Sequence, residues 1–113
     1  MAQFSQDTSV DGSTVVRAVG EVDLSTAQDL AAAVRPCLAD GESVVLDLSG
    51  VEFIDSSGLG TLVQLLKEAA RNGASLTLGG VTASTYRLLE VTGLAAVFDV
   101  RLANKGSDGV AST

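Results

Sequence analysis

Hydrophobic and polar positions along the chain form two kinds of segment that alternate with one another. Short apolar and β-branched runs occupy 14–19, 43–49, 75–78 and 97–102, and such runs are typical of strands in a sheet. Between them, apolar residues recur every three or four positions, which indicates helices that bury one face. The pattern therefore predicts an α/β domain in which crossover helices join parallel strands.

The amino-terminal end departs from this alternation. A weakly alternating run at 3–10 ends at Asp11-Gly12, a dipeptide typical of two-residue hairpin turns, and the segment 20–24 then leads the chain off the strand at 14–19. We therefore expect an antiparallel edge strand beside a mostly parallel sheet. The loops at the carboxyl ends of the parallel strands should meet along one edge, which would bring Asp23 close to Ser56.

The first predicted helix follows this segment, and Ser25 or Thr26 can cap its first turn. Pro36 lies inside the helical pattern, where it removes one backbone hydrogen bond and should bend or end the helix nearby. Cys37, beside it, is expected to be a small apolar filler rather than a reactive thiol. The apolar face consists of Ala27, Leu30, Ala31, Val34 and Leu38.

Two further helices are predicted downstream. One begins near Ser56, after the strand at 43–49 and a connection over 50–52. Its apolar face consists of Leu59, Leu62, Val63, Leu66, Ala69 and Ala70. A shorter helix is predicted over 85–92, and Gly79-Gly80 is predicted to end the strand before it.

Composition is that of a globular protein. The 113 residues are enough for one domain with its own core, and 46% of them are hydrophobic while 19% are charged. Residues 104–113 lack any hydrophobic periodicity. We therefore predict one domain over 1–103 and a flexible carboxyl-terminal tail over 104–113.

Charge narrows the choice of partners. The formal net charge is −7 and the seven basic residues form no cluster, whereas binding to nucleic acid or to anionic lipid depends on clustered Lys and Arg. We therefore expect a basic protein partner, with no nucleic acid and no membrane. A single cysteine fits a reducing compartment, and the chain shows neither a secretory leader nor a membrane-spanning run, so we expect a cytoplasmic protein.

An enzymatic role is not expected. The chain contains no histidine, which removes the commonest general base and the commonest metal ligand. The run 79–82 lacks the lysine and the spacing of a phosphate-binding loop, so no cofactor is expected. Asp47, on a strand, is expected to be exposed or to be a satisfied structural carboxylate. The alternative is an enzyme in which Asp55 activates Ser56 as nucleophile, which requires a strongly raised aspartate pKa.

The most distinctive chemistry lies in Asp55-Ser56-Ser57-Gly58, where a strand gives way to a helix. Asp and Ser side chains accept hydrogen bonds from the free N–H groups of a first helical turn, and one oxygen is enough for an ordinary cap. The motif offers three such side chains, Asp55, Ser56 and Ser57, which is more than capping requires. Hydroxyls at the positive end of a helix dipole are well placed to carry a phosphate, so the motif is either a plain cap or a phosphorylation site.

Four segments of the chain resemble, in order and spacing, the STAS-domain anti-sigma factor antagonists of bacteria. These segments are Gly20-Glu21-Val22-Asp23, Val45-Leu46-Asp47-Leu48, Phe53 to Gly60, and Leu88 to Leu94. The resemblance covers about residues 4–102, and it implies a single STAS-like domain with a mostly parallel sheet, an antiparallel amino-terminal edge strand and packed helices. Family members commonly end with a further amphipathic helix, for which residues 106–113 lack the apolar spacing.

The resemblance also implies a function. The first serine of the motif, Ser56, would be phosphorylated by an anti-sigma factor that is itself a serine kinase, and a serine phosphatase would reverse the step. The unphosphorylated chain would bind this kinase and release the sigma factor. Ser57 is implied to tune phosphorylation. The partner-binding surface would comprise Asp23, Asp55, Ser57, Gly58 and Leu59. The alternative is a non-switching STAS scaffold subunit of a stress-sensing or transport-associated complex.

Overall fold

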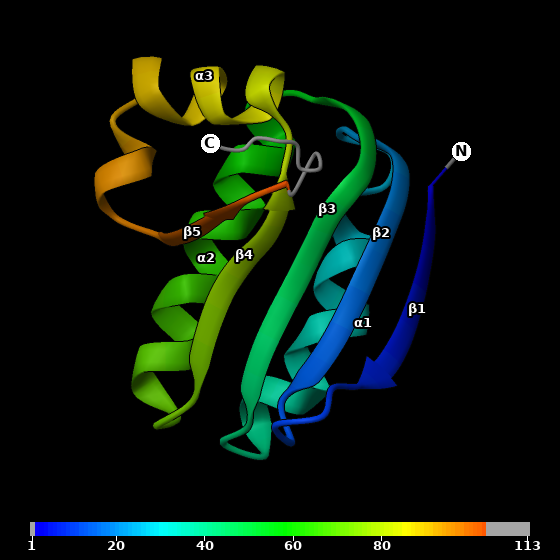
Figure 1. Cartoon of the computed structure of the whole chain (residues 1–113), viewed down its shortest axis with the longest axis vertical. Coiled ribbons are helices and arrows are strands. Elements are labelled where there is room, and N and C mark those ends of the chain that lie inside the picture. Colours follow the sequence, from blue (N-terminus) through cyan, green and yellow to red (C-terminus); the bar gives the residue numbers. More distant parts are fainter. Residues whose placement is uncertain (1, 104–113) are drawn as a thin grey trace.

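The computed structural model describes residues 2–103, which form a five-stranded sheet in the order β1-β2-β3-β4-β5 (Figure 1). The strands are β1 (Gln3–Thr8), β2 (Thr14–Val22), β3 (Ser43–Ile54), β4 (Ser75–Val81) and β5 (Asp99–Leu102). β1 runs antiparallel to β2, and every other neighbouring pair is parallel. The predicted α/β fold with an antiparallel edge strand is therefore confirmed. The predicted tail at 104–113 lies outside the described residues.

Two long helices cover one face of this sheet (Figure 1). The helical elements are α1 (Ala27–Ala39), α2 (Ser56–Arg71), α3 (Ala83–Val91) and the short 3₁₀ helix η1 (Leu94–Ala96). α1 and α2 lie side by side behind the sheet, whereas α3 lies at the end of the sheet where β4 finishes (Figure 1). The core fills the layer between α1, α2 and the sheet, and its fully buried side chains include Leu30, Leu46, Leu62 and Leu78.

The predicted apolar face of α1 is confirmed, because all five of its residues are buried. Cys37 is buried beside them, and burial raises the pKa of its thiol, in keeping with the predicted packing role. Pro36 is exposed, and the helix ends at Ala39, within one turn of it. The predicted end near Pro36 is thus confirmed in position, but the helix runs through the proline, and Gly41, with a φ of +72°, follows its cap residue Asp40.

The predicted face of α2 is wrong at two positions. Leu65, which it left out, is fully buried, and Ala70 is exposed, whereas Val63 and Leu66 are partly buried and pack against the core. The buried residues of the helix are Gly58, Leu59, Leu62, Leu65 and Ala69. Gly58 faces the sheet at the start of the helix, and this contact fixes how the helix is rotated about its axis. Positions three and four residues further along then follow on the same stripe.

β2 and β3 extend further than the sequence predicts. The segment 50–52, predicted as a connection, belongs to β3, which continues to Ile54, and β2 continues past Gly20 to Val22. Each strand supports the other, because Gly20 pairs with Val51 and Val22 pairs with Ile54. The pairing has register shifts, which explains why neither segment shows a regular alternation of apolar and polar residues.

The prediction that Gly79-Gly80 ends β4 is also wrong, because the strand continues to Val81. A Cβ on Gly79 would lie 2.8 Å from the Val45 side chain, and Gly80 adopts a φ of +58° directly against the Asp47 carboxylate. The pairing with β5 shifts register at this point. The two glycines therefore form an irregularity within the strand rather than its exit.

The amino-terminal hairpin is confirmed, but its loop is longer than two residues. The Ser9 N–H donates to the Ser13 carbonyl (2.9 Å), and the Asp11 carboxylate accepts the Ser13 N–H (3.0 Å). Gly12 adopts a φ of +90°, a backbone conformation that a side chain would disfavour. The loop is thus organised by the aspartate and the glycine that mark it in the sequence.

Asp47 is a satisfied structural carboxylate, one of the two roles that the sequence left open. It accepts hydrogen bonds from the Arg17 guanidinium Nε (3.0 Å) and from the Ser49 N–H (2.9 Å). Burial raises the pKa of this carboxyl, but the hydrogen bonds from Ser49 and the Arg17 ion pair outweigh that effect and hold the pKa below its ordinary value.

The lowered pKa of Asp47 predicts a pH dependence of stability. A carboxyl whose pKa is lower in the folded chain stabilises the fold above its unfolded pKa, about 3.8, and this contribution is lost as the pH falls below that value. We expect wild-type protein to unfold at a higher urea concentration than Asp47→Asn at neutral pH, and the difference to shrink as the pH falls below about 4. A difference independent of pH would contradict this account.

Candidate functional site

Asp55 marks the point where β3 ends and α2 begins. Its backbone is extended, as is usual for the residue that caps a helix, and its carboxylate accepts the Gly58 N–H (3.0 Å). Its own N–H donates to the carbonyl of Val22 (3.1 Å), the last residue of the neighbouring strand. A single residue therefore joins the start of α2 to the ends of β2 and β3.

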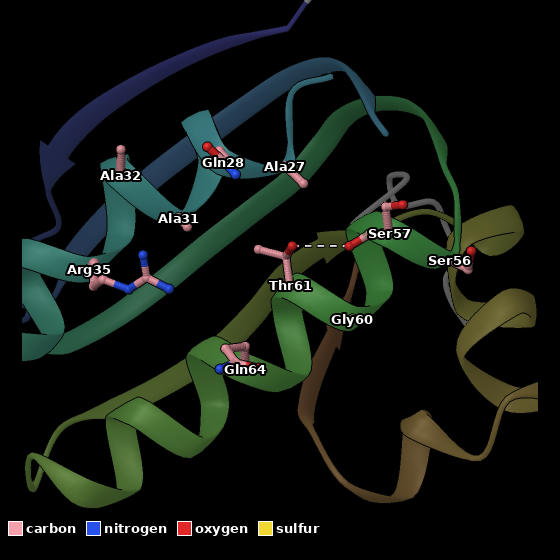
Figure 2. A pocket seen from close by; sticks show the side chains of 10 residues that line it. All are labelled: Ala27, Gln28, Ala31, Ala32, Arg35, Ser56, Ser57, Gly60, Thr61 and Gln64. Carbon is pink, nitrogen blue, oxygen red and sulfur yellow. Dashed lines mark hydrogen bonds between the residues drawn. The ribbon is translucent and has the colours of Figure 1, made fainter. Parts of the chain in front are cut away.

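Because the Asp55 side chain caps the helix, the side chains of Ser56 and Ser57 are not needed for capping. Ser56 is exposed at the first position of α2, and Ser57 is partly buried. Among the described residues, neither hydroxyl makes a hydrogen bond, and the Ser57 carbonyl accepts one from the Thr61 hydroxyl (3.0 Å; Figure 2). The Ser56 hydroxyl is thus accessible, and it lies where the helix dipole favours an added negative charge.

Gly58 and Leu59 point inward. A Cβ on Gly58 would lie 2.6 Å from the Val22 carbonyl oxygen and 2.7 Å from the Ile54 side chain, so the first turn of α2 packs directly on the strand ends. Leu59 is only 7% exposed. Neither residue presents an exposed side chain, and their place in the partner-binding surface that the resemblance implies stays a prediction.

Asp23 organises the turn between β2 and α1. Its Oδ1 accepts the N–H groups of Ser25 (3.0 Å) and Thr26 (3.2 Å) and the Ser25 hydroxyl (2.7 Å). These hydrogen bonds, that of the Ser25 hydroxyl first, hold the pKa of Asp23 below its ordinary value. The Thr26 hydroxyl donates to the Glu21 carbonyl (2.8 Å) and makes no cap bond to α1. Thr26 therefore stands at the N-cap position, one of the two that were predicted, but its side chain makes no capping hydrogen bond.

The predicted meeting of the two loops at one edge of the sheet is confirmed. Asp23, Leu24 and Ser25 from the β2–α1 turn line an open hollow of about 440 Å³ together with Asp55 from the start of α2. The shared edge thus brings Asp23 beside Asp55, and Ser56 lines a different hollow.

That second hollow, of about 700 Å³, runs between α1 and α2 (Figure 2). It begins at Ser56 and Ser57 and reaches Arg35, whose guanidinium donates two hydrogen bonds to the Glu68 carboxylate (2.7 and 2.9 Å). Its walls are otherwise formed by small or uncharged residues, namely Ala27, Gln28, Ala31, Ala32, Gly60, Thr61 and Gln64. Arg35 is thus occupied by an ion pair that ties the two helices together.

The carboxyl ends of β2 and β3 carry acidic and exposed apolar residues together. We refer to Glu21, Asp23, Glu52 and Asp55 as the acidic rim. No Lys or Arg occurs anywhere in 18–34 or 36–66. Sequence reasoning missed two exposed apolar residues here, Leu24 (78% exposed) and Phe53 (53%). For Leu24, a lone apolar residue in a polar loop was the available signal.

Other chemistry is sparse in the part of the chain that the structure describes. Residues 2–103 contain no group of three or more Cys, Asp or Glu side chains that could hold a metal ion. Over the same residues, no helix combines the length and the apolar character needed to cross a bilayer.

Comparisons with known proteins agree with this fold. The STAS domain family model matches residues 4–107. The anti-sigma-B factor antagonist of Bacillus subtilis is 31% identical over 91 residues, with 80% of this chain and 84% of that protein covered. The antagonist of the same name from Staphylococcus aureus is 34% identical over 94 residues, with coverage of 82% and 84%.

A solved structure is similar as well. The crystal structure of an anti-sigma factor antagonist from Mycobacterium paratuberculosis matches with a TM-score of 0.79 and 29% sequence identity, over 89% of this chain and 86% of that one. The family model spans nearly the whole chain, and the sheet order, the helices and these relatives agree with it. The chain therefore belongs to the STAS-domain family.

Proposed function

We propose that this chain is an anti-sigma factor antagonist controlled by phosphorylation of Ser56. Unmodified, it binds an anti-sigma factor that is itself a serine kinase, and the sigma factor is released. Phosphorylation ends this binding, and a serine phosphatase restores it. The observation that carries the proposal is the Ser56 hydroxyl, which is exposed and makes no hydrogen bond within residues 2–103 while Asp55 caps the helix. The names of the two relatives support the class of partner.

The charge of the surroundings supports a switch that needs no change of fold. A phosphate adds about −1.5 to −2 charges at neutral pH. The helix dipole makes that charge tolerable to the domain itself, but the acidic rim beside it becomes more negative. A partner that packs against the unmodified rim would then meet a bulky, hydrated anion, which costs binding through desolvation and repulsion of any acidic groups of its own.

The test is intact-mass spectrometry of the purified chain after incubation with ATP, magnesium and candidate anti-sigma factor kinases from the same genome. We expect a gain of one phosphate in wild-type protein and in Ser57→Ala, and none in Ser56→Ala. Both variants remove a hydroxyl that makes no hydrogen bond to any described residue, so both should fold normally.

The two serine variants separate the outcomes. A phosphate that persists in Ser56→Ala and disappears in Ser57→Ala would move the site by one residue. The absence of phosphate with every candidate kinase would refute the proposal.

A further inference from the structure

We propose that Leu24 is the apolar anchor of the surface that binds the anti-sigma factor, and that Asp23 acts mainly by holding Leu24 in position. This inference rests on the proposed function. It assigns to the partner an apolar socket bordered by Lys or Arg. Leu24 would fill the socket, and the basic side chains would face the acidic rim.

The exposure of Leu24 is not unusual by itself, since single apolar residues are common on protein surfaces. Its position at the edge of a hollow is what points to a binding role. The side chain is 78% exposed and stands beside the hollow that Asp23, Ser25 and Asp55 line. A leucine at the edge of a concave surface offers both a protruding group and a recess to a partner, and such central apolar anchors carry much of the energy of protein interfaces.

The turn that presents Leu24 is held by hydrogen bonds on both sides. The Asp23 carbonyl accepts the N–H groups of Thr26 (3.1 Å) and Ala27 (2.8 Å), and the Asp23 N–H donates to the Thr26 hydroxyl (3.0 Å). Together with the carboxylate contacts to Ser25 and Thr26, these bonds fix the backbone on each side of Leu24. A preorganised loop loses little conformational entropy on binding, which increases affinity for a partner of matching shape.

The same contacts show what the Asp23 carboxylate does. Its hydrogen bonds to Ser25 and Thr26 all end on Oδ1 and lie within the turn. The main role of the Asp23 carboxylate is therefore to stabilise the turn, and its charge makes a secondary contribution to partner binding. Loss of the carboxylate would release Leu24 from its position.

Charge complementarity identifies the partner's side of the contact. Asp23 and Asp55 line the hollow beside Leu24, and the flanking sequence contains no Lys or Arg over 18–34 and 36–66. A cationic border on the partner would pair with this rim and speed association. Asp55 lines the same hollow as Leu24 and precedes Ser56 in the sequence, so a phosphate on Ser56 would lie at the edge of the surface that we propose binds the anti-sigma factor.

The test is a binding titration of the full chain with the anti-sigma factor kinase that phosphorylates it, without ATP. We expect Leu24→Ala to bind at least tenfold more weakly, and Leu24→Met to bind within about threefold of wild type. Val91→Ala is the matched control, because Val91 is 74% exposed on α3, and it should bind within twofold. Thermal unfolding should be unchanged in all three, since each side chain lies outside the core.

Asp23 is tested through its effect on Leu24. Asp23→Asn keeps the Oδ1 acceptor and should retain most of the binding, whereas Asp23→Ala should lose about as much as Leu24→Ala. In the Leu24→Ala background, Asp23→Ala should add little, because the two changes remove the same contact. Equal losses for Asp23→Asn and Asp23→Ala would instead assign the effect to charge and overturn the positioning role.

The outcomes also separate this inference from the proposed function. If wild-type protein binds and is phosphorylated while Leu24→Ala binds within twofold of it, the anchor is refuted and the switch at Ser56 stands. If wild-type protein neither binds nor is phosphorylated by any such kinase, the proposed function fails and the inference falls with it.

Discussion

Phosphorylation of Ser56 is expected to weaken binding of the anti-sigma factor kinase by at least about 100-fold, equivalent to about 2.8 kcal/mol. The phosphate would add its charge next to Asp55 and beside the acidic rim, on a surface where the unmodified hydroxyl makes no hydrogen bond within the described chain. The measurement is a pair of titrations with phosphorylated and unmodified protein, in the absence of ATP so that neither form changes.

The salt dependence of binding distinguishes the two causes of the weaker binding, which are charge repulsion and the bulk of the phosphate. Charge repulsion is screened as the salt concentration rises, whereas the steric effect of the phosphate does not depend on salt. We therefore expect the difference between the two forms to shrink with salt but not to disappear. A phosphorylated form that binds within threefold of the unmodified one would show that Ser56 is not the switch.

Gly58→Ala is expected to lower the free energy of unfolding by about 2 to 3 kcal/mol, in the range that overpacking of a close contact costs. The added methyl would lie 2.6 Å from the Val22 carbonyl oxygen, a backbone atom that cannot rotate away, and 2.7 Å from Ile54. The variant would therefore push the first turn of α2 away from the strand ends. Urea unfolding followed by far-ultraviolet circular dichroism measures the change.

Gly60→Ala is the matched control on the same helix. A Cβ at Gly60 meets nothing within 4 Å, so only the better helix propensity of alanine remains, and the fold should gain up to about 1 kcal/mol. Opposite signs for the two variants would confirm that close packing, and not glycine flexibility, is required at Gly58. A loss of stability in both would contradict this reading.

Much of the fold could be predicted because local pattern and tertiary structure agree. The order of strands and helices, the hairpin and the apolar face of α1 all follow from the spacing of apolar residues and from residues such as Gly12. The last part of β3 did not, because Gly50 and Glu52 break the alternation and only the pairing with β2 makes that segment a strand. Rotation of α2 likewise depends on the contact of Gly58 with the sheet.

The candidate site was predictable in place but not in detail. The sequence located Asp55 and Ser56 at a helix start and put Asp23 on the same edge of the sheet. It did not show which of three side chains would cap α2, because Asp and Ser compete for the same N–H groups and backbone geometry decides between them. The exposure of Leu24 depends on the turn that Asp23 closes, and that turn is visible only in three dimensions.

The hydrogen bond from the Asp55 N–H to the Val22 carbonyl joins residues that are 33 positions apart in the sequence. Closing a loop of this length and pairing parallel strands are late, non-local events in folding. An incompletely folded chain thus contains Ser56 but lacks the acidic rim, which forms only when both strand ends are in place. A kinase that must bind the assembled rim would phosphorylate only folded molecules. Newly synthesised or unfolded copies of the chain would then stay unphosphorylated.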